Sequence, residues 1–213
     1  MKMIRYTLLS DGSSDKMLIP IIDWLLYQHC SEIAVESSWA DLGRLQEPPK
    51  TLHNKILVAL DLYPCDLLFV HRDAEHERYE IRHAEICREL SKLTAPPAVC
   101  VIPVRMMEAW FLFEKSAIRK AAGNPHGSNP LNLPNVNSLE NHPNPKKVLF
   151  NLIKDSSGRS GVRLKKLNLH KCAFLVSKYI DDFSPLRSLE AFQLLETELA
   201  TTLMGCGWKA EDS

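Results

Sequence analysis

The chain has 213 residues, of which 45% are hydrophobic and 24% charged, a composition typical of a globular protein with a full hydrophobic core. Its 26 basic and 26 acidic residues balance, so nucleic-acid or membrane binding would need a local concentration of charge. No apolar run approaches the roughly 18 residues of a membrane span, and the first residues show no signal-peptide pattern. We therefore expect a cytoplasmic protein with no membrane partner.

Short apolar runs and amphipathic stretches alternate along the first part of the chain. Strands are predicted at about 4–9, 33–38, 66–71 and 98–104. Helices are predicted at about 14–29, 50–62, 75–93 and 106–122. Alternation of this kind is typical of a parallel sheet covered by helices. We therefore predict an α/β core with a parallel sheet of about four strands flanked by helices.

The second part of the chain has a different character. Residues 124–145 are rich in proline and asparagine, which predicts a loop. Later residues show only helical patterns, at about 145–155, 169–181 and 187–204. The sequence therefore predicts three segments: an α/β core over 1–123, a loop over 124–145, and an all-helical C-terminal extension over 146–213 packed on the core.

The six cysteines predict neither a disulfide framework nor a zinc finger. None of them forms a C-x-x-C pair, and no group of cysteines and histidines has zinc-finger spacing. Several lie within apolar runs, which is typical of reduced cysteines in a core. The six are Cys30, Cys65, Cys87, Cys100, Cys172 and Cys206.

Acidic side chains follow three of the predicted strands. Asp11 follows the first strand, Asp73 the third and Glu108 the fourth. Ligands of open α/β sheets bind at the edge where the carboxyl ends of the strands meet. Carboxylates gathered at that edge suit a hard cation such as Mg²⁺ and metal-assisted phosphoryl chemistry.

The turn after the first strand has two interpretations. Gly12 permits a tight turn, and the helix that follows presents free N–H groups that favour an anion. Asp11 is therefore a candidate metal ligand or general acid–base. Alternatively, Asp11 and Asp15 only cap the turn and the helix, which is common where a strand leads into a helix.

His71, Asp73 and Glu75 alternate at the end of the third strand. Residues i and i+2 of an extended chain point the same way, so these three side chains could converge on one metal ion. Alternatively, His71 is a hydrogen-bonded histidine at the core edge, and Glu75 begins a helix. Asp73 is harder to explain structurally, because an aspartate directly after a buried strand needs a partner.

Glu108 lies among apolar residues in the first turn of a predicted helix. A partly buried carboxylate is uncommon unless it is paired, and Arg105 would be a structural partner. We take three of these acids as candidate catalytic residues, with two further candidate metal ligands. The catalytic candidates are Asp11, Asp73 and Glu108, and the added ligands are His71 and Glu75.

Positive charge is concentrated between residues 144 and 178, a stretch that contains nine basic residues and only one acidic residue. The middle of this stretch, residues 156–163, is rich in glycine and serine, whose backbone can approach phosphate. A basic strip in a neutral chain is a candidate contact for a nucleic-acid backbone. The alternatives are a solvated face or a surface for an acidic protein. The candidate phosphate-binding residues are Arg72, Arg105, Lys146, Lys147, Arg159, Arg163, Lys165 and Lys166.

Taken together, these residues resemble the Toprim-type metal-binding fold of topoisomerases, bacterial primases and the overcoming-lysogenization-defect nucleases. That fold has an acid and a glycine after its first strand and an Asp-x-Asp after a later strand. Asp11-Gly12 matches the first motif, with aspartate where glutamate is usual. His71-x-Asp73 lies in the register of the second, and Asp73-x-Glu75 is the alternative register.

A closer likeness covers nearly the whole chain. It is to small stand-alone Toprim-like bacterial proteins, usually labelled as a domain of unknown function. Relatives are often encoded beside ATPases of the structural-maintenance-of-chromosomes type and are linked to phage defence. The segments that carry the likeness are residues 71–75, 103–106, 108–110, 121–125 and 183–187.

The resemblance implies a nuclease or related phosphoryl-transfer enzyme that uses Mg²⁺ or Mn²⁺. The implied substrate is nucleic acid, with DNA preferred over RNA, and the implied partner is an ATPase. Asp11 is one methylene shorter than glutamate, which reduces its reach by about 1.5 Å. His71 is a softer ligand than aspartate and favours Mn²⁺. The alternatives are a non-catalytic Toprim-like subunit or sensor that binds nucleic acid or a protein, and a receiver-like domain phosphorylated on Asp73.

Overall fold

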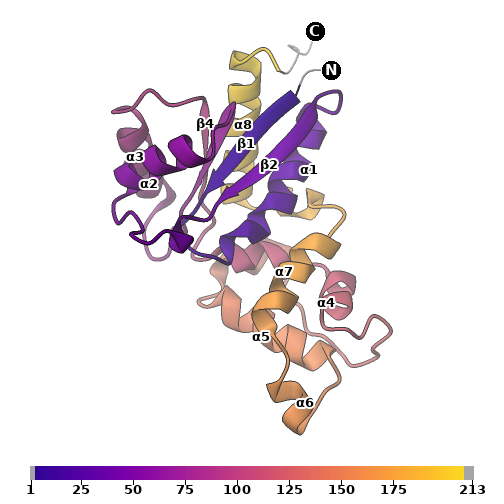
Figure 1. Cartoon of the computed structure of the whole chain (residues 1–213). Helices are drawn as coiled ribbons and strands as arrows, with labels where there is room; N and C mark the ends of the chain where they lie inside the picture. Colours follow the sequence, from indigo (N-terminus) through magenta and orange to yellow (C-terminus); the bar gives the residue numbers. More distant parts are fainter. Residues whose placement is uncertain (1–2, 209–213) are drawn as a thin grey trace.

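The computed structural model describes residues 3–208 (Figure 1). The strands are β1 (Met3–Leu9), β2 (Ala34–Ala40), β3 (Leu67–His71) and β4 (Ala98–Val101). The α-helices are α1 (Ile19–His29), α2 (Leu52–Leu62), α3 (Tyr79–Leu90), α4 (Lys115–Ala121), α5 (Pro145–Ser156), α6 (Gly161–Lys165), α7 (Leu169–Tyr179) and α8 (Glu190–Gly205). Short 3-10 helices are η1 (Asp15–Leu18), η2 (Leu42–Arg44), η3 (Met107–Phe111), η4 (Val136–Asn141) and η5 (Ser184–Ser188).

The four strands form one parallel sheet in the order β2-β1-β3-β4. All five residues of β3 are buried, as expected for a central strand covered on both faces. The sheet confirms the predicted α/β fold, and the residues after 145 are helical as predicted. Because the strands are parallel, the carboxyl ends of β1, β3 and β4 meet at one edge of the sheet, called here the carboxyl edge.

Helices cover both faces of the sheet (Figure 1). On one face α2 and α3 contribute Ile56 and Ile86 to a small core with Val70. On the other face, α1 packs on β1 and β2, and the same hydrophobic cluster continues through η3 and α4 into α5, α7 and α8. The C-terminal helices therefore share one core with the sheet.

Two predicted helices are shorter in the structure because the chain turns after β3 and β4. The helix predicted at 75–93 begins at Tyr79, since Glu75 has a φ of 54° and lies in a turn. The helix predicted at 106–122 divides into η3 and α4, where the Glu114 side chain accepts a hydrogen bond from Ser116 N and caps a new helix. The interpretation of Glu75 as the first residue of a helix is therefore wrong.

The helix α6 was not predicted from the sequence. It has five residues, none of them buried, so it shows no apolar periodicity. The predicted loop over 124–145 is irregular except for η4, whose Leu139 is buried. Among residues 3–208, the helices are all too short or too polar to cross a membrane.

Candidate metal centre

The loops that follow β3 and β4 run side by side at the carboxyl edge. Ala74 N donates a hydrogen bond to Pro103 O at 3.0 Å, and Glu75 N donates to Arg105 O at 3.1 Å. Glu75 and Arg105 both have positive φ angles, 54° and 61°. This conformation is costly for residues with a Cβ atom and is concentrated at functional sites. The paired loops hold the predicted site residues in a fixed arrangement.

His71 has the hydrogen-bond pattern of a metal ligand. The side chain is buried, and its Nδ1 lies 2.9 Å from Val101 O. Because a carbonyl oxygen can only accept, Nδ1 is the donor, and Nε2 faces two carboxylates. It lies 3.6 Å from Asp73 Oδ1 and 3.8 Å from Asp15 Oδ2. Metal-binding histidines typically donate their second ring N–H to a carbonyl or carboxylate in this way.

Asp73 lies at the centre of a cluster of acids. Its Oδ1 accepts a hydrogen bond from Met107 N at 2.8 Å, which attaches η3 to the loop after β3. Burial, together with the charges of Glu108 and Asp15, raises the pKa of Asp73 to about 6, although His71 acts in the opposite direction. A carboxylate that is hard to ionise because it is buried beside other acids is stabilised by a divalent cation.

Glu108 is only 3% exposed, although it carries a carboxylate. Lys146 Nζ at the start of α5 lies 3.5 Å from Glu108 Oε1. No ion pair between Glu108 and Arg105 is found among the described residues, so Lys146 takes the place of the predicted structural partner. The contact brings the beginning of the basic strip to the acidic cluster.

The two aspartates of the first turn lie in different environments. The Asp11 side chain is 44% exposed and forms ion pairs with Lys55 and, at 3.3 Å, with Arg72 Nε. Asp15 is 8% exposed, and its Oδ2 accepts a hydrogen bond from Gly12 N at 2.7 Å. Asp15 is therefore a turn residue, as one interpretation had it, but it also lies beside His71. The sequence did not indicate this second role.

Four side chains thus form what we call the acidic cluster: Asp15, His71, Asp73 and Glu108. A small pocket of about 100 Å³ opens beside it, with space for a few water molecules. Its lining residues are Asp11, Asp15, His71, Arg72, Asp73, Glu75 and Arg82. The Glu75 carboxylate is paired with one of these residues, since its Oε2 lies 3.7 Å from Arg82 Nη2.

The predicted phosphate-binding residues fall into two groups. Near the acidic cluster, Arg72 lines the small pocket, Arg105 lines a neighbouring one with Asp73, and Lys146 binds Glu108. The others are exposed on α5, on α6 and on the loop between them. Figure 1 shows α6 at the tip of the helical region, far from the sheet. These exposed residues are Lys147, Arg159, Arg163, Lys165 and Lys166.

A larger pocket of about 540 Å³, not predicted from the sequence, lies next to η1. It places the ammonium group of Lys16 4.8 Å from the ring centre of Phe174 and 5.7 Å from that of Trp39. Lys171 adds positive charge to its wall, whereas Arg44 is paired with Asp41, which also lines the pocket. Cations beside aromatic rings are the combination that binds single-stranded nucleic acid. We call this the basic–aromatic pocket. Because its Lys16 directly follows Asp15 in the chain, the pocket adjoins the acidic cluster.

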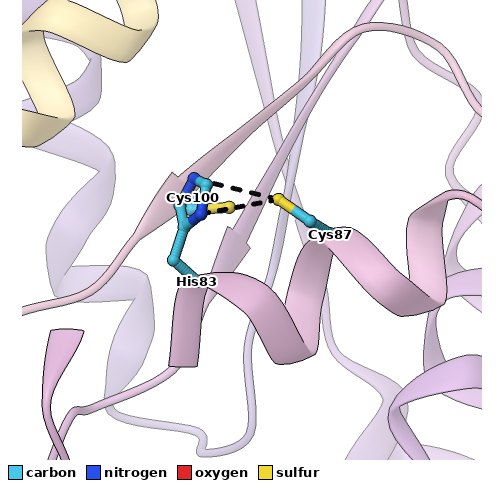
Figure 2. A group of neighbouring side chains, drawn as sticks. All are labelled: His83, Cys87 and Cys100. Carbon is cyan, nitrogen blue, oxygen red and sulfur yellow. Dashed lines mark hydrogen bonds between the residues drawn. The ribbon is translucent and has the colours of Figure 1, made fainter. Parts of the chain in front are cut away.

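A second group of metal-binding side chains lies elsewhere, on α3 and β4 (Figure 2). The ligand atoms of His83, Cys87 and Cys100 all lie within 4.8 Å of one another, and we call these three residues the thiol group. Over residues 3–208, no other group of three His, Cys, Asp or Glu residues is so compact. The acidic cluster is therefore more widely spaced than the thiol group.

No protein-family model matches the chain, and no curated protein or solved structure does so either. The Toprim-like resemblance therefore depends on the sequence segments named above and stays a prediction. Because one fold supports many activities, the function has to be argued from the site.

Proposed function

We propose that this protein is a metal-dependent nuclease or related phosphoryl-transfer enzyme of the Toprim type, in which the acidic cluster binds Mg²⁺ or Mn²⁺. One observation carries the proposal. Asp15 and Asp73 face Nε2 of a histidine whose Nδ1 donates to a backbone carbonyl, and Glu108 is near enough to Asp73 to raise the pKa of that carboxyl. Oxygen ligands with one imidazole suit Mg²⁺ or Mn²⁺, and the imidazole favours Mn²⁺.

Each part of the surrounding surface has a role in this proposal. A metal bound at the cluster would polarise the scissile phosphate and activate water. Arg72, Arg105 and Lys146 border the cluster and would bind phosphate oxygens. Asp11 lines the same pocket and is exposed, so it can pass a proton to solvent.

The basic–aromatic pocket would hold the strand next to the cleaved phosphate. Bases can stack on Trp39 and Phe174, and Lys16 can bind the backbone. Stacking requires unpaired bases, so the proposed substrate is single-stranded DNA or a duplex end that frays. The resemblance also implies an ATPase partner and a role in phage defence, which we retain as part of the proposal.

A cleavage assay tests the proposal. Purified protein is mixed with plasmid and with single-stranded DNA and RNA in Mg²⁺, in Mn²⁺ and in EDTA, alone and together with an ATPase of the structural-maintenance-of-chromosomes type, the partner that the resemblance implies. We expect cleavage with either metal, none in EDTA, and a loss of at least about 100-fold in Asp73→Asn and Glu108→Gln.

The matched control is Asp61→Asn, an exposed aspartate at the opposite end of α2 from the carboxyl edge. Its activity should equal that of the unchanged protein. If no substrate is cut under any of these conditions, or if Asp73→Asn cleaves as fast as Asp61→Asn, the proposal is wrong.

A second candidate function is a non-catalytic subunit or sensor that binds nucleic acid. The spacing of the acidic cluster favours it, because its ligand atoms are less compact than those of the thiol group. The ion pairs of Asp11 with Lys55 and Arg72 also favour it, since they neutralise that acid. DNA binding that needs the basic–aromatic pocket but no metal, without cleavage, would support this alternative.

A further inference from the structure

The thiol group combines residues from two elements that face each other. His83 and Cys87 are four residues apart on α3 and therefore share one side of the helix. Cys87 Sγ lies 3.7 Å from His83 Nδ1 and 3.8 Å from His83 Nε2. Cys100 projects from β4 toward α3, and Figure 2 shows the three side chains pointing toward one another.

A fourth side chain comes from α8. Glu198 Oε1 accepts a hydrogen bond from Cys100 N at 3.0 Å, and Glu198 Oε2 lies 3.4 Å from His83 Nε2. β4 is at the edge of the sheet, so this carboxylate pairs a backbone N–H that no strand can reach. The ring of Tyr79 stacks on His83, with 5.7 Å between ring centres, and restricts the orientation of the imidazole.

We propose that His83, Cys87, Cys100 and Glu198 form a structural zinc site. A tetrahedral zinc ion with ordinary Zn–S and Zn–N bonds places sulfur and nitrogen about 3.6 Å apart, close to the separations between Cys87 and His83. Two sulfur ligands and one imidazole prefer zinc over the hard cations expected at the acidic cluster. Four protein ligands leave no open position, which is typical of a structural site.

The proton balance of this site is simple. Burial and the neighbouring Glu198 carboxylate raise the pKa of the Cys100 thiol, so the thiol is protonated before the metal arrives. Binding one Zn²⁺ ion displaces one proton from Cys87 and one from Cys100, while His83 binds as the neutral imidazole. Zn²⁺, two thiolates and one carboxylate then sum to a single negative charge, and no electron is transferred.

The surroundings permit entry of the ion and suggest its purpose. Cys100 is 1% exposed, whereas Cys87 is exposed and His83 is half-buried, so zinc reaches the buried thiol from the surface. The four ligands come from α3, β4 and α8, and Glu198 is 98 residues from Cys100 in the chain. Zinc would therefore attach the last helix to the open edge of the sheet. None of the four residues lines the pocket at the acidic cluster.

The test uses the full chain, reduced and stripped of metal with a chelator. Zinc is titrated against a chromophoric chelator, and Co²⁺ is used as a spectroscopic substitute. We expect one zinc per chain, sulfur-to-cobalt charge-transfer bands with tetrahedral intensity, and a melting temperature higher by about 5–10 °C with zinc at one hundred times its Kd. A large excess of Mg²⁺ or Mn²⁺ should not displace the zinc.

Three variants assign the ligands. Cys87→Ser changes an exposed thiol, so it should fold, lose the charge-transfer intensity of one thiolate and bind zinc at least about 100-fold more weakly. Glu198→Gln keeps an oxygen for Cys100 N and should bind at least about tenfold more weakly. Cys206→Ser, the control at the C-terminal end of α8, should bind like the unchanged protein.

The outcomes are decisive. The inference is overturned if the reduced protein binds no zinc, or if Cys87→Ser binds zinc as tightly as Cys206→Ser. It is also overturned if Cys87 and Cys100 form a disulfide on oxidation but do not bind zinc when reduced. Unchanged binding in Glu198→Gln would overturn the assignment of the fourth ligand. Loss of zinc binding in Cys87→Ser but not in Cys206→Ser supports the site, whatever the outcome of the cleavage assay.

Discussion

The acidic cluster and the thiol group lie on the same sheet but are built differently. The acidic cluster uses the imidazole at the end of β3 and oxygen atoms from the segments that follow β1, β3 and β4, with two residues of positive φ beside it. The thiol group and Glu198 lie in the regular parts of α3, β4 and α8, where backbone hydrogen bonds fix each ligand. Turns at strand ends can present groups to a substrate, whereas regular elements suit a closed site that holds the fold together.

The largest effect that we expect from this comparison is that the acidic cluster makes the stability of the folded protein depend on pH. The pKa of Asp73 is about 6 in the folded protein, above the ordinary 3.8 of the unfolded chain. The folded state then binds more protons at Asp73 than the unfolded state between these values. The contribution of Asp73 to stability is therefore fully present below about pH 4 and is lost as the pH rises to about 6.

Asp73→Asn should remove that loss. Because the side chain is partly open to solvent, we expect the variant to gain about 2 kcal/mol over the unchanged protein at pH 7.5, and much less at pH 4.5. Urea unfolding of both metal-free proteins at the two pH values measures the difference. Asp61→Asn is the control and should shift stability equally at both. A gain for Asp73→Asn that is the same at pH 4.5 and 7.5 would contradict the proposed environment of Asp73.

A smaller effect distinguishes the two groups of basic residues. Lys16 and Lys171 belong to the basic–aromatic pocket, whereas Lys165 and Lys166 lie at the end of α6. Each double change to glutamine removes the same charge. We expect the pocket pair to weaken binding of single-stranded DNA about tenfold and the α6 pair much less, because only the first pair combines phosphate contacts with stacking.

Fluorescence anisotropy with a labelled oligonucleotide, at several salt concentrations, measures both affinities. The slope of affinity against salt should decrease for Lys16→Gln with Lys171→Gln, since phosphate contacts are lost. If the α6 pair has the larger effect, nucleic acid binds along the basic strip that the sequence indicates, and the pocket has another purpose.

Local sequence predicted the carboxyl edge well. Buried parallel strands are short apolar runs, so their ends could be located. In the structure Asp73 follows the end of β3 closely, and Glu108 lies in η3, the first helical turn after β4. Asp15 was assigned only a local role, because a carboxylate that accepts from Gly12 N already explains an aspartate at a turn. Its approach to His71 depends on how β1 and β3 pair, which no local pattern specifies.

Residues far apart in the chain account for what the sequence did not predict. The spacing of His83 and Cys87 was readable as one helix face, but Cys100 and Glu198 join them only after α3 and α8 pack on the sheet. The basic strip shows the reverse case. Its residues are close in sequence, yet Lys146 contacts Glu108 while Lys166 ends a helix at the far tip.

The most direct test is to locate the two metals in one crystal form. Crystals of the reduced protein are soaked in Mn²⁺ or in Zn²⁺, and anomalous maps are collected at the absorption edge of each metal. We predict manganese among Asp15, His71, Asp73 and Glu108, and zinc among His83, Cys87, Cys100 and Glu198. If no manganese is found at the acidic cluster, whether or not the crystals bind it at other sites, the account of this protein as a metal-dependent phosphoryl-transfer enzyme is contradicted.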